Sequence, residues 1–321
     1  MPHWLDIYLL WLILFLYVVM ASIDFGTGGL MVYMRLTGRQ RAGAVLDQLL
    51  KAYFWIYFYV FLLAALAGLF VLNETLLETF VPPLKWPVLG ILLMHMVWKG
   101  FTYWIPLNQV RLSVTFCMGL LSLIIPGVMA SVLAVSEGGF ISDETMMLDY
   151  GTFLTSIYPW SVGILAVVSV MYISSAYHVR YFHLHVEQQA DTPRHLTLYW
   201  SMPTLLASAL VFAALQGHNN EHFINALDHA WLFMLSLISL LIAISLVFRK
   251  YLISGAFGFV VLQFFFAFYG YGISHLPYLL YPNIKLADDI PSGAVWFIIA
   301  LLLILGLIYG AVKVLERAHH R

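Results

Sequence analysis

The chain has 321 residues, of which 62% are hydrophobic and 10% are charged. Soluble domains carry about 25% charged residues, so this composition excludes a soluble globular protein, a disordered chain and a disulfide scaffold. The single cysteine, Cys117, excludes an internal disulfide and any site built from several cysteines. The net charge of −1 leaves no basic excess that would favour nucleic acid as a partner. The composition therefore predicts an all-α integral membrane protein with several spans.

A helix that spans a bilayer needs roughly 20 mostly apolar residues. In chain order, this criterion predicts nine spans, over residues 5–32, 54–72, 86–104, 113–135, 156–177, 199–216, 230–248, 251–273 and 294–312. The first apolar stretch is too long for a signal peptide and lacks a cleavage site, so we expect a retained helix. The longest predicted connections are residues 136–155, 179–198 and 274–293. None is long enough to fold alone, which predicts one transmembrane domain over residues 1–321.

The basic residues gather on one side of these predicted spans. All of them except Lys85 and Lys285 lie in or beside the odd-numbered connections or in the C-terminal segment. Lys and Arg are enriched in cytoplasmic loops, so the pattern predicts an N-terminus outside the cell and a C-terminus in the cytoplasm. We therefore expect a multi-pass protein of the cytoplasmic membrane.

The first predicted span ends with an acid among glycines, in residues 23–29. Asp24 lies about 25 Å into the span at 1.5 Å per residue. A carboxylate at that depth costs a few kcal/mol unless it is paired, hydrated or protonated. We expect a buried structural acid, with a proton path and simple hydration as alternatives, and Gly26, Gly28 and Gly29 should allow a neighbouring helix to approach closely. The candidate hydrogen-bonding partners of this acid are Thr27, Lys51 and Tyr53.

Histidines provide the other candidates for chemistry. His95 lies near mid-membrane and could ligate haem iron, but His178 and His275 are predicted at other depths. We expect His95 to make an interhelical hydrogen bond instead, and Lys99 to extend towards the interface. His218 and His222 have the i, i+4 spacing of a metal site on a helix, but the adjacent glycine and paired asparagines favour a loop.

Two stretches resemble subunit II of the cytochrome bd-type terminal oxidases. Residues 23–29 lead into residues 35–39, which read Arg-Leu-Thr-Gly-Arg, and this is similar to the family's glycine-rich Asp-Phe-Gly motif followed by a short basic turn. Residues 269–282 are similar to the end of the family's eighth helix, where a Pro-Tyr pair precedes an outer loop. Nine helices with the N-terminus outside also fit this family.

The resemblance implies two four-helix bundles and one extra helix, which would be residues 294–312. In the family, subunit I carries two b-type haems, a haem d or a third haem b, and the quinol site, whereas subunit II binds no redox haem. The resemblance thus implies a quinol:oxygen oxidoreductase in which this chain binds a haem-bearing subunit I and catalyses nothing alone. A small single-helix subunit and a lipid or structural quinone are further partners that it allows.

One segment departs from the family pattern. The family's second helix opens with an acid that is thought to serve a proton path, whereas residues 49–57 here contain Trp55 but no acid, and Asp47 precedes the helix. Protons would then pass through the partner subunit, or Asp24 would replace the missing acid. Structural or proton-path roles are therefore expected for Asp24, Gly26, Gly28, Gly29, Trp55 and Lys99.

Two other function classes stay open at this point. A polytopic secondary transporter fits the number of predicted spans, although no pair of interrupted helices occupies matching halves of the chain. A b-type cytochrome that uses His95 as a haem ligand is the second alternative.

Overall fold

The computed structural model describes residues 4–51, 74–107, 109–142, 145–185, 189–282 and 284–285. The long helices are α1 (Trp4–Leu36), α4 (Glu74–Trp104), α5 (Leu112–Leu133), α7 (Ile157–His185), α8 (Asp191–His218), α10 (Ala230–Phe248) and α11 (Ile253–His275). The shorter elements are α2 (Gln40–Lys51), the 3₁₀ turn η1 (Ala134–Glu137), α6 (Tyr150–Thr155), α9 (Asn220–Asp228), β1 (Tyr278–Leu280) and β2 (Ile284–Lys285). The two short strands pair antiparallel.

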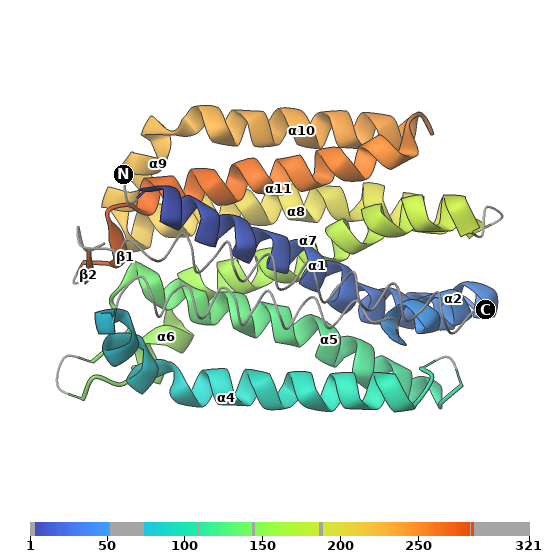
Figure 1. Ribbon diagram of the computed structural model, residues 1–321, viewed down its shortest axis with the longest axis horizontal. Coiled ribbons are helices and arrows are strands. Elements are labelled where there is room, and N and C mark those ends of the chain that lie inside the picture. Colours follow the sequence, from blue (N-terminus) through green and yellow to red (C-terminus); the bar gives the residue numbers. More distant parts are fainter. Residues whose placement is uncertain are drawn as a thin grey trace.

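The long helices run along the long axis of the molecule (Figure 1). Helix α4 lies along one edge and α10 along the other, with α1 and α7 between them. Helix α1 packs on α5 and α7, α4 packs on α5, and α7, α8, α10 and α11 pack on one another in sequence-adjacent pairs. The described helices therefore fall into a group of α1, α4 and α5 and a group of α7, α8, α10 and α11, and the groups meet where α1 and α5 pack on α7.

Six of the described helices are long and apolar enough to cross a membrane: α1, α5, α7, α8, α10 and α11. The chain is therefore a multi-pass membrane protein, and the regular structure of its described residues is helical apart from one short hairpin. Each of these helices covers a predicted span to within two residues at either end, and the predicted span of residues 86–104 lies within α4. The predicted spans of residues 54–72 and 294–312 lie outside the described residues.

The structure corrects several predicted boundaries. Helix α7 continues to His185 and α8 begins at Asp191, so most of the connection predicted over residues 179–198 is helical. The predicted bounds follow hydropathy, so they end where polar residues begin. The helix itself can continue beyond that point into water. Hydropathy also does not predict α2, α6 and α9, because these helices are too short or too polar to span a membrane.

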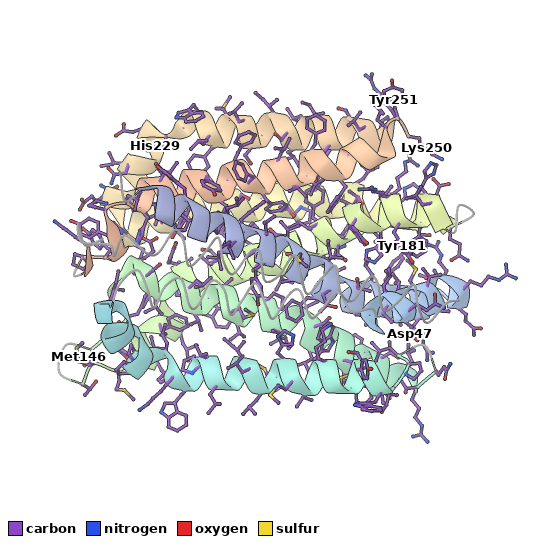
Figure 2. The ribbon with its side chains drawn as sticks, viewed as in Figure 1. Asp47, Met146, Tyr181, His229, Lys250 and Tyr251 are labelled. Atoms are coloured by element: carbon purple, nitrogen blue, oxygen red, sulfur yellow. The ribbon has the colours of Figure 1, made fainter. Side chains whose placement is uncertain are left out.

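The two ends of the bundle differ in charge. Helix α2 and the α7–α8 and α10–α11 connections lie at one end, which we call the basic end; η1, α6, α9 and the hairpin lie at the other, the hairpin end (Figure 1). At the basic end, Arg194 donates hydrogen bonds to the carbonyls of Val247 and Phe248, and Lys250 pairs with Asp191 at 2.9 Å. Figure 2 places Lys250 there, and Met146 and His229 at the hairpin end. The described helices thus alternate in direction as the charge pattern predicts.

Candidate functional site

Two buried polar clusters lie within the described helices, and the first is centred on Asp24 in α1. Asp24 is 6% exposed, and one of its carboxylate oxygens pairs with the ammonium of Lys99 in α4. The Lys99 ammonium also lies 4.7 Å from the ring centroid of Trp98, in cation–π contact. The predicted extension of Lys99 towards the interface is therefore wrong, because a carboxylate and an aromatic face bind its charge inside the bundle.

Two glycines allow α1 to lie against its neighbours just beyond this ion pair. A Cβ atom on Gly26 would lie 2.6 Å from the carbonyl oxygen of Val170 and would also strike the Ser174 side chain of α7. A Cβ atom on Gly28 would lie 2.5 Å from the hydroxyl of Ser122 in α5. The close approach predicted from the glycines is thus confirmed at both positions. The contacts fix the rotation of α1 and so direct Asp24 towards α4.

Thr27 does not contribute to the ion pair. Its hydroxyl donates to the carbonyl of Ile23 at 2.6 Å and lies 3.3 Å from Nε2 of His178 in α7. The other ring nitrogen of His178 lies 2.5 Å from the carbonyl of Ser174. Thr27 was a candidate partner of Asp24, and that prediction is wrong; the side chains of Lys51 and Tyr53 lie outside the described residues. His178, expected at a span's end, is fully buried.

Two further sequence candidates can be placed. His95 is 3% exposed in α4, one turn before Lys99, with its ring centroid 5.2 Å from that of Phe25. Its predicted interhelical hydrogen bond stays a prediction. Asp47 in α2 is also buried, and its carboxylate accepts a hydrogen bond from the Leu107 amide at 2.9 Å, which ties α2 to the end of α4. Trp55 lies outside the described residues.

The second cluster surrounds Glu137, the last residue of η1, at the hairpin end. Glu137 is 2% exposed. Its carboxylate accepts a hydrogen bond from the side-chain amide of Asn219 at 2.9 Å and another from the Tyr271 hydroxyl. Nδ1 of His222 lies 2.9 and 3.0 Å from the two carboxylate oxygens, and Nδ1 of His275 lies 3.5 Å from one of them. We call Glu137, His222 and His275 the Glu137 cluster.

Local capping brings His222 into this cluster. Helix α8 ends at His218, and the side chain of Asn219 caps α9 by accepting a hydrogen bond from the His222 amide at 3.1 Å. The loop predicted here is therefore wrong for His222, which lies in the first turn of α9. His218 and His222 do not share a helix; instead His218 stacks on Phe140 and Tyr158, with centroid distances of 4.7 and 5.2 Å.

Sequence reasoning missed the Glu137 cluster. It placed Glu137 only among the acids of an outer loop, since its partners lie 82 to 138 positions further along the chain. The asparagine cap before an acidic first turn was a readable signal for α9. No local pattern indicated that this short helix would bring a histidine to a buried glutamate.

Three comparisons with known proteins agree with one another. The family model described as cytochrome bd terminal oxidase subunit II matches residues 3–314. A Bacillus subtilis (strain 168) protein named "putative cytochrome bd menaquinol oxidase subunit II" is 25% identical over 302 residues, which cover 89% of this chain and 86% of that protein. A chain in the structure of bd oxidase from Geobacillus thermodenitrificans is 31% identical, with a TM-score of 0.81 and coverage of 98% of this chain and 97% of that one.

Proposed function

The chain belongs to the cytochrome bd terminal oxidase subunit II family, and from that premise we propose that it is the haem-free subunit of a quinol:oxygen oxidoreductase. The family is part of a quinol oxidase complex, so a subunit I is its expected partner. In this proposal subunit I carries the b-type haems, the haem d or third haem b, and the quinol site. This chain supplies a membrane scaffold and catalyses nothing alone.

The state of the buried histidines supports the haem-free role. Nδ1 of His178 lies 2.5 Å from the Ser174 carbonyl of its own helix, and Nε2 lies 3.3 Å from the Thr27 hydroxyl of α1, so the ring faces protein groups on both sides. His95 is enclosed by Phe25 and Trp98, whose ring centroids lie 5.2 and 6.2 Å away. A flat macrocycle at His95 would have to displace those rings.

The Asp24–Lys99 ion pair carries the proposal of a scaffold role. Two opposite charges that are buried together offset each other's desolvation, whereas either charge alone is costly. The pair joins α1 to α4, and the glycine contacts join α1 to α5 and α7. We assign Asp24, Lys99 and the three glycines a structural role, with a proton path from the cytoplasm through Asp24 as the competing role. Trp55, which lies outside the described residues, is assigned the same structural or proton-path role that the sequence predicts.

The same proposal includes the orientation. The basic end of the bundle faces the cytoplasm and the hairpin end faces outward, in line with the enrichment of Lys and Arg in cytoplasmic loops. The protein then lies in the cytoplasmic membrane with nine spans, two of which are residues 54–72 and 294–312. Its first eight spans form two four-helix bundles, which would pack against subunit I.

Co-purification with a haem spectrum tests the assignment. An affinity tag on this chain should bring down a larger haem-bearing membrane protein, and the reduced-minus-oxidised spectrum should be unchanged by His95→Ala. A haem band that disappears in the His95→Ala complex would favour the b-type cytochrome. A stable haem-free monomer with transport activity of its own would favour the transporter.

A neutral pair separates the two roles of Asp24. The double variant Asp24→Leu with Lys99→Met replaces both charges with apolar groups of similar size. If the pair is structural, the complex should assemble and its oxygen uptake per complex should stay within about threefold of the wild type. If Asp24 carries protons, the complex should assemble but its uptake should fall by tenfold or more, which corresponds to about 1.4 kcal/mol in the barrier.

A further inference from the structure

We propose that the Glu137 cluster binds a divalent transition metal of the Zn²⁺ type, through one carboxylate and two imidazole nitrogens. The side chains of Glu137, His222 and His275 each offer a ligand atom, and these atoms lie within 4.8 Å of one another. This inference does not rest on the proposed role of the chain in an oxidase.

The donor set suits this class of metal. Imidazole nitrogen binds Zn²⁺, Cu²⁺, Ni²⁺ and Fe²⁺, whereas Ca²⁺ and Mg²⁺ prefer oxygen alone. Two histidines with one glutamate are a known ligand set for zinc that leaves one coordination position open. Glu137 and His222 are almost completely buried, so their side chains are held in place before any metal arrives.

The distances between the ligand atoms are close to those around a tetrahedral ion. Two ligands that are each about 2.0–2.1 Å from zinc are separated by about 3.3 Å. Nδ1 of His222 lies 2.9 and 3.0 Å from the two oxygens of Glu137, and Nδ1 of His275 lies 3.5 Å from the nearer oxygen.

The surroundings of Nε2 of His222 favour the tautomer in which Nδ1 faces Glu137 with a lone pair. Nε2 lies 3.2 Å from the carbonyl oxygen of Tyr271, which can only accept a hydrogen bond. It also lies 2.9 Å from the hydroxyl of Ser274, whose own proton is donated to the same carbonyl at 2.8 Å. A hydrogen on Nε2 can be donated to this carbonyl, and Nδ1 then offers its lone pair, as in histidines that bind a metal through the opposite nitrogen.

In the tautomer with its hydrogen on Nε2, His222 needs a cation between Nδ1 and the Glu137 carboxylate. In the neutral ring, the Nδ1 lone pair would point at a carboxylate, and the two would repel. Either a second proton on His222 or a metal ion removes that repulsion. Nδ1 lies almost equally far from both carboxylate oxygens, as a ligand would if the carboxylate bound the same ion. A metal also offsets the charge of a glutamate that is only 2% exposed.

A shallow recess at the hairpin end lies beside the two histidines of the site. His222 and His275 line it, together with Glu221, Asn225, Tyr278 and Tyr281. The hydroxyl of Tyr281 donates to Glu221 at 2.8 Å on the rim. The bound ion would join η1, α9 and α11, which are far apart in the sequence.

Zinc content of the purified complex tests this site. The intact complex is equilibrated with ZnSO₄, passed through a desalting column and measured by elemental mass spectrometry, in parallel with a His275→Gln complex. The side chain of His275 is 12% exposed, the most exposed of the three, and Gln keeps a polar group there, so assembly should be retained. We expect the wild type to retain one zinc ion per complex more than His275→Gln. Zinc K-edge absorption of the wild type should show imidazole ligands.

His229→Gln is the matched control, because His229 lies at the same end of the bundle with Nδ1 bound to the carbonyl of Asn225 at 2.9 Å (Figure 2). That variant should keep the full zinc content. His222→Gln should lose the ion as well, and if that variant fails to assemble, His275→Gln decides. Equal zinc in the wild type and His275→Gln would overturn the proposal and leave a protonated His222 as the partner of Glu137.

Discussion

The Asp24 pair and the Glu137 cluster place a carboxylate out of water in opposite ways. The negative charge of Asp24 is balanced by one side chain, that of Lys99, whose ammonium pairs directly with the carboxylate. Glu137 accepts hydrogen bonds from Asn219 and from Tyr271 of α11 and lies against the His222 imidazole of α9, and none of these groups has a fixed full charge. Each charge of the Asp24 pair is thus stable only with the other, whereas the Glu137 cluster divides the same task among several groups.

This difference predicts how each region responds to mutation. Removal of one partner from a buried ion pair leaves an uncompensated charge, at a cost of about 3–5 kcal/mol. Removal of one donor among several leaves the remaining hydrogen bonds in place and costs about 1–3 kcal/mol. Sensitivity to single substitutions should therefore be steep at Asp24 and graded at Glu137.

The largest effect is expected from Lys99→Met alone. This change leaves the Asp24 carboxylate buried without its cation, so the yield of assembled complex should fall by at least tenfold. Asp24→Leu alone should do the same to Lys99. The double variant should recover most of the yield, as measured by size-exclusion chromatography of tagged complex. If each single variant assembled as well as the wild type, Asp24 would have to be neutral or hydrated in the bundle.

Gly26→Ala should have the next largest effect on the region around Asp24. The new methyl group would press on the Val170 carbonyl and on Ser174, so α1 would have to move away from α7. Overpacking of this kind costs about 1–3 kcal/mol. Gly90→Ala in α4 is the control, because a Cβ atom there meets nothing within 4 Å. We expect Gly26→Ala to lower the temperature at which half of the complex is lost on heating, and Gly90→Ala to leave it unchanged or raise it.

The sequence predicted the helices better than it predicted their polar contacts. Long apolar stretches identify spans because hydropathy acts over a whole helix, and the glycines beside Asp24 marked close packing by their lack of side chains. The partner of Asp24 lies 75 positions further along the chain. Lys99 had an equally reasonable alternative at the interface, and only the fold decides between the two. Glu137 was harder still, because its histidine comes from a helix too short for a periodic signal.

Asn219 provides a smaller test at the Glu137 cluster. Its side chain accepts a hydrogen bond from the His222 amide and donates one to Glu137, at 3.1 and 2.9 Å. Asn219→Ala should cost about 1–2 kcal/mol through loss of the cap and of one donor. Asn219→Ser keeps a capping oxygen but is too short to serve both partners, so it should cost less. Heating of the assembled complex measures both variants, and a collapse of assembly in Asn219→Ala would contradict the graded response expected here.

The smallest effect is expected at Asp149, a fully exposed acid at the same end that caps α6. The Thr152 hydroxyl donates to its carboxylate at 2.6 Å, and the amides of Thr152 and Gly151 add weaker bonds. These bonds hold the pKa of Asp149 below its ordinary value of 3.8. A depressed pKa stabilises the folded form above the unfolded pKa, and this contribution is lost as the pH falls through the folded value.

Hydrogen exchange of the α6 amides, corrected for the intrinsic rate, should therefore be slow at pH 6 and accelerate as the pH falls below about 4. Asp149→Asn keeps a capping oxygen without a titrating charge, so protection of α6 should become independent of pH in this range. Lys99→Met and Asn219→Ala should leave this pH dependence unchanged, because the ion pair of Lys99 and the hydrogen bonds of Asn219 go to residues outside α6. If the exchange of α6 changed with pH in Asp149→Asn as it does in the wild type, a group other than Asp149 would control the helix.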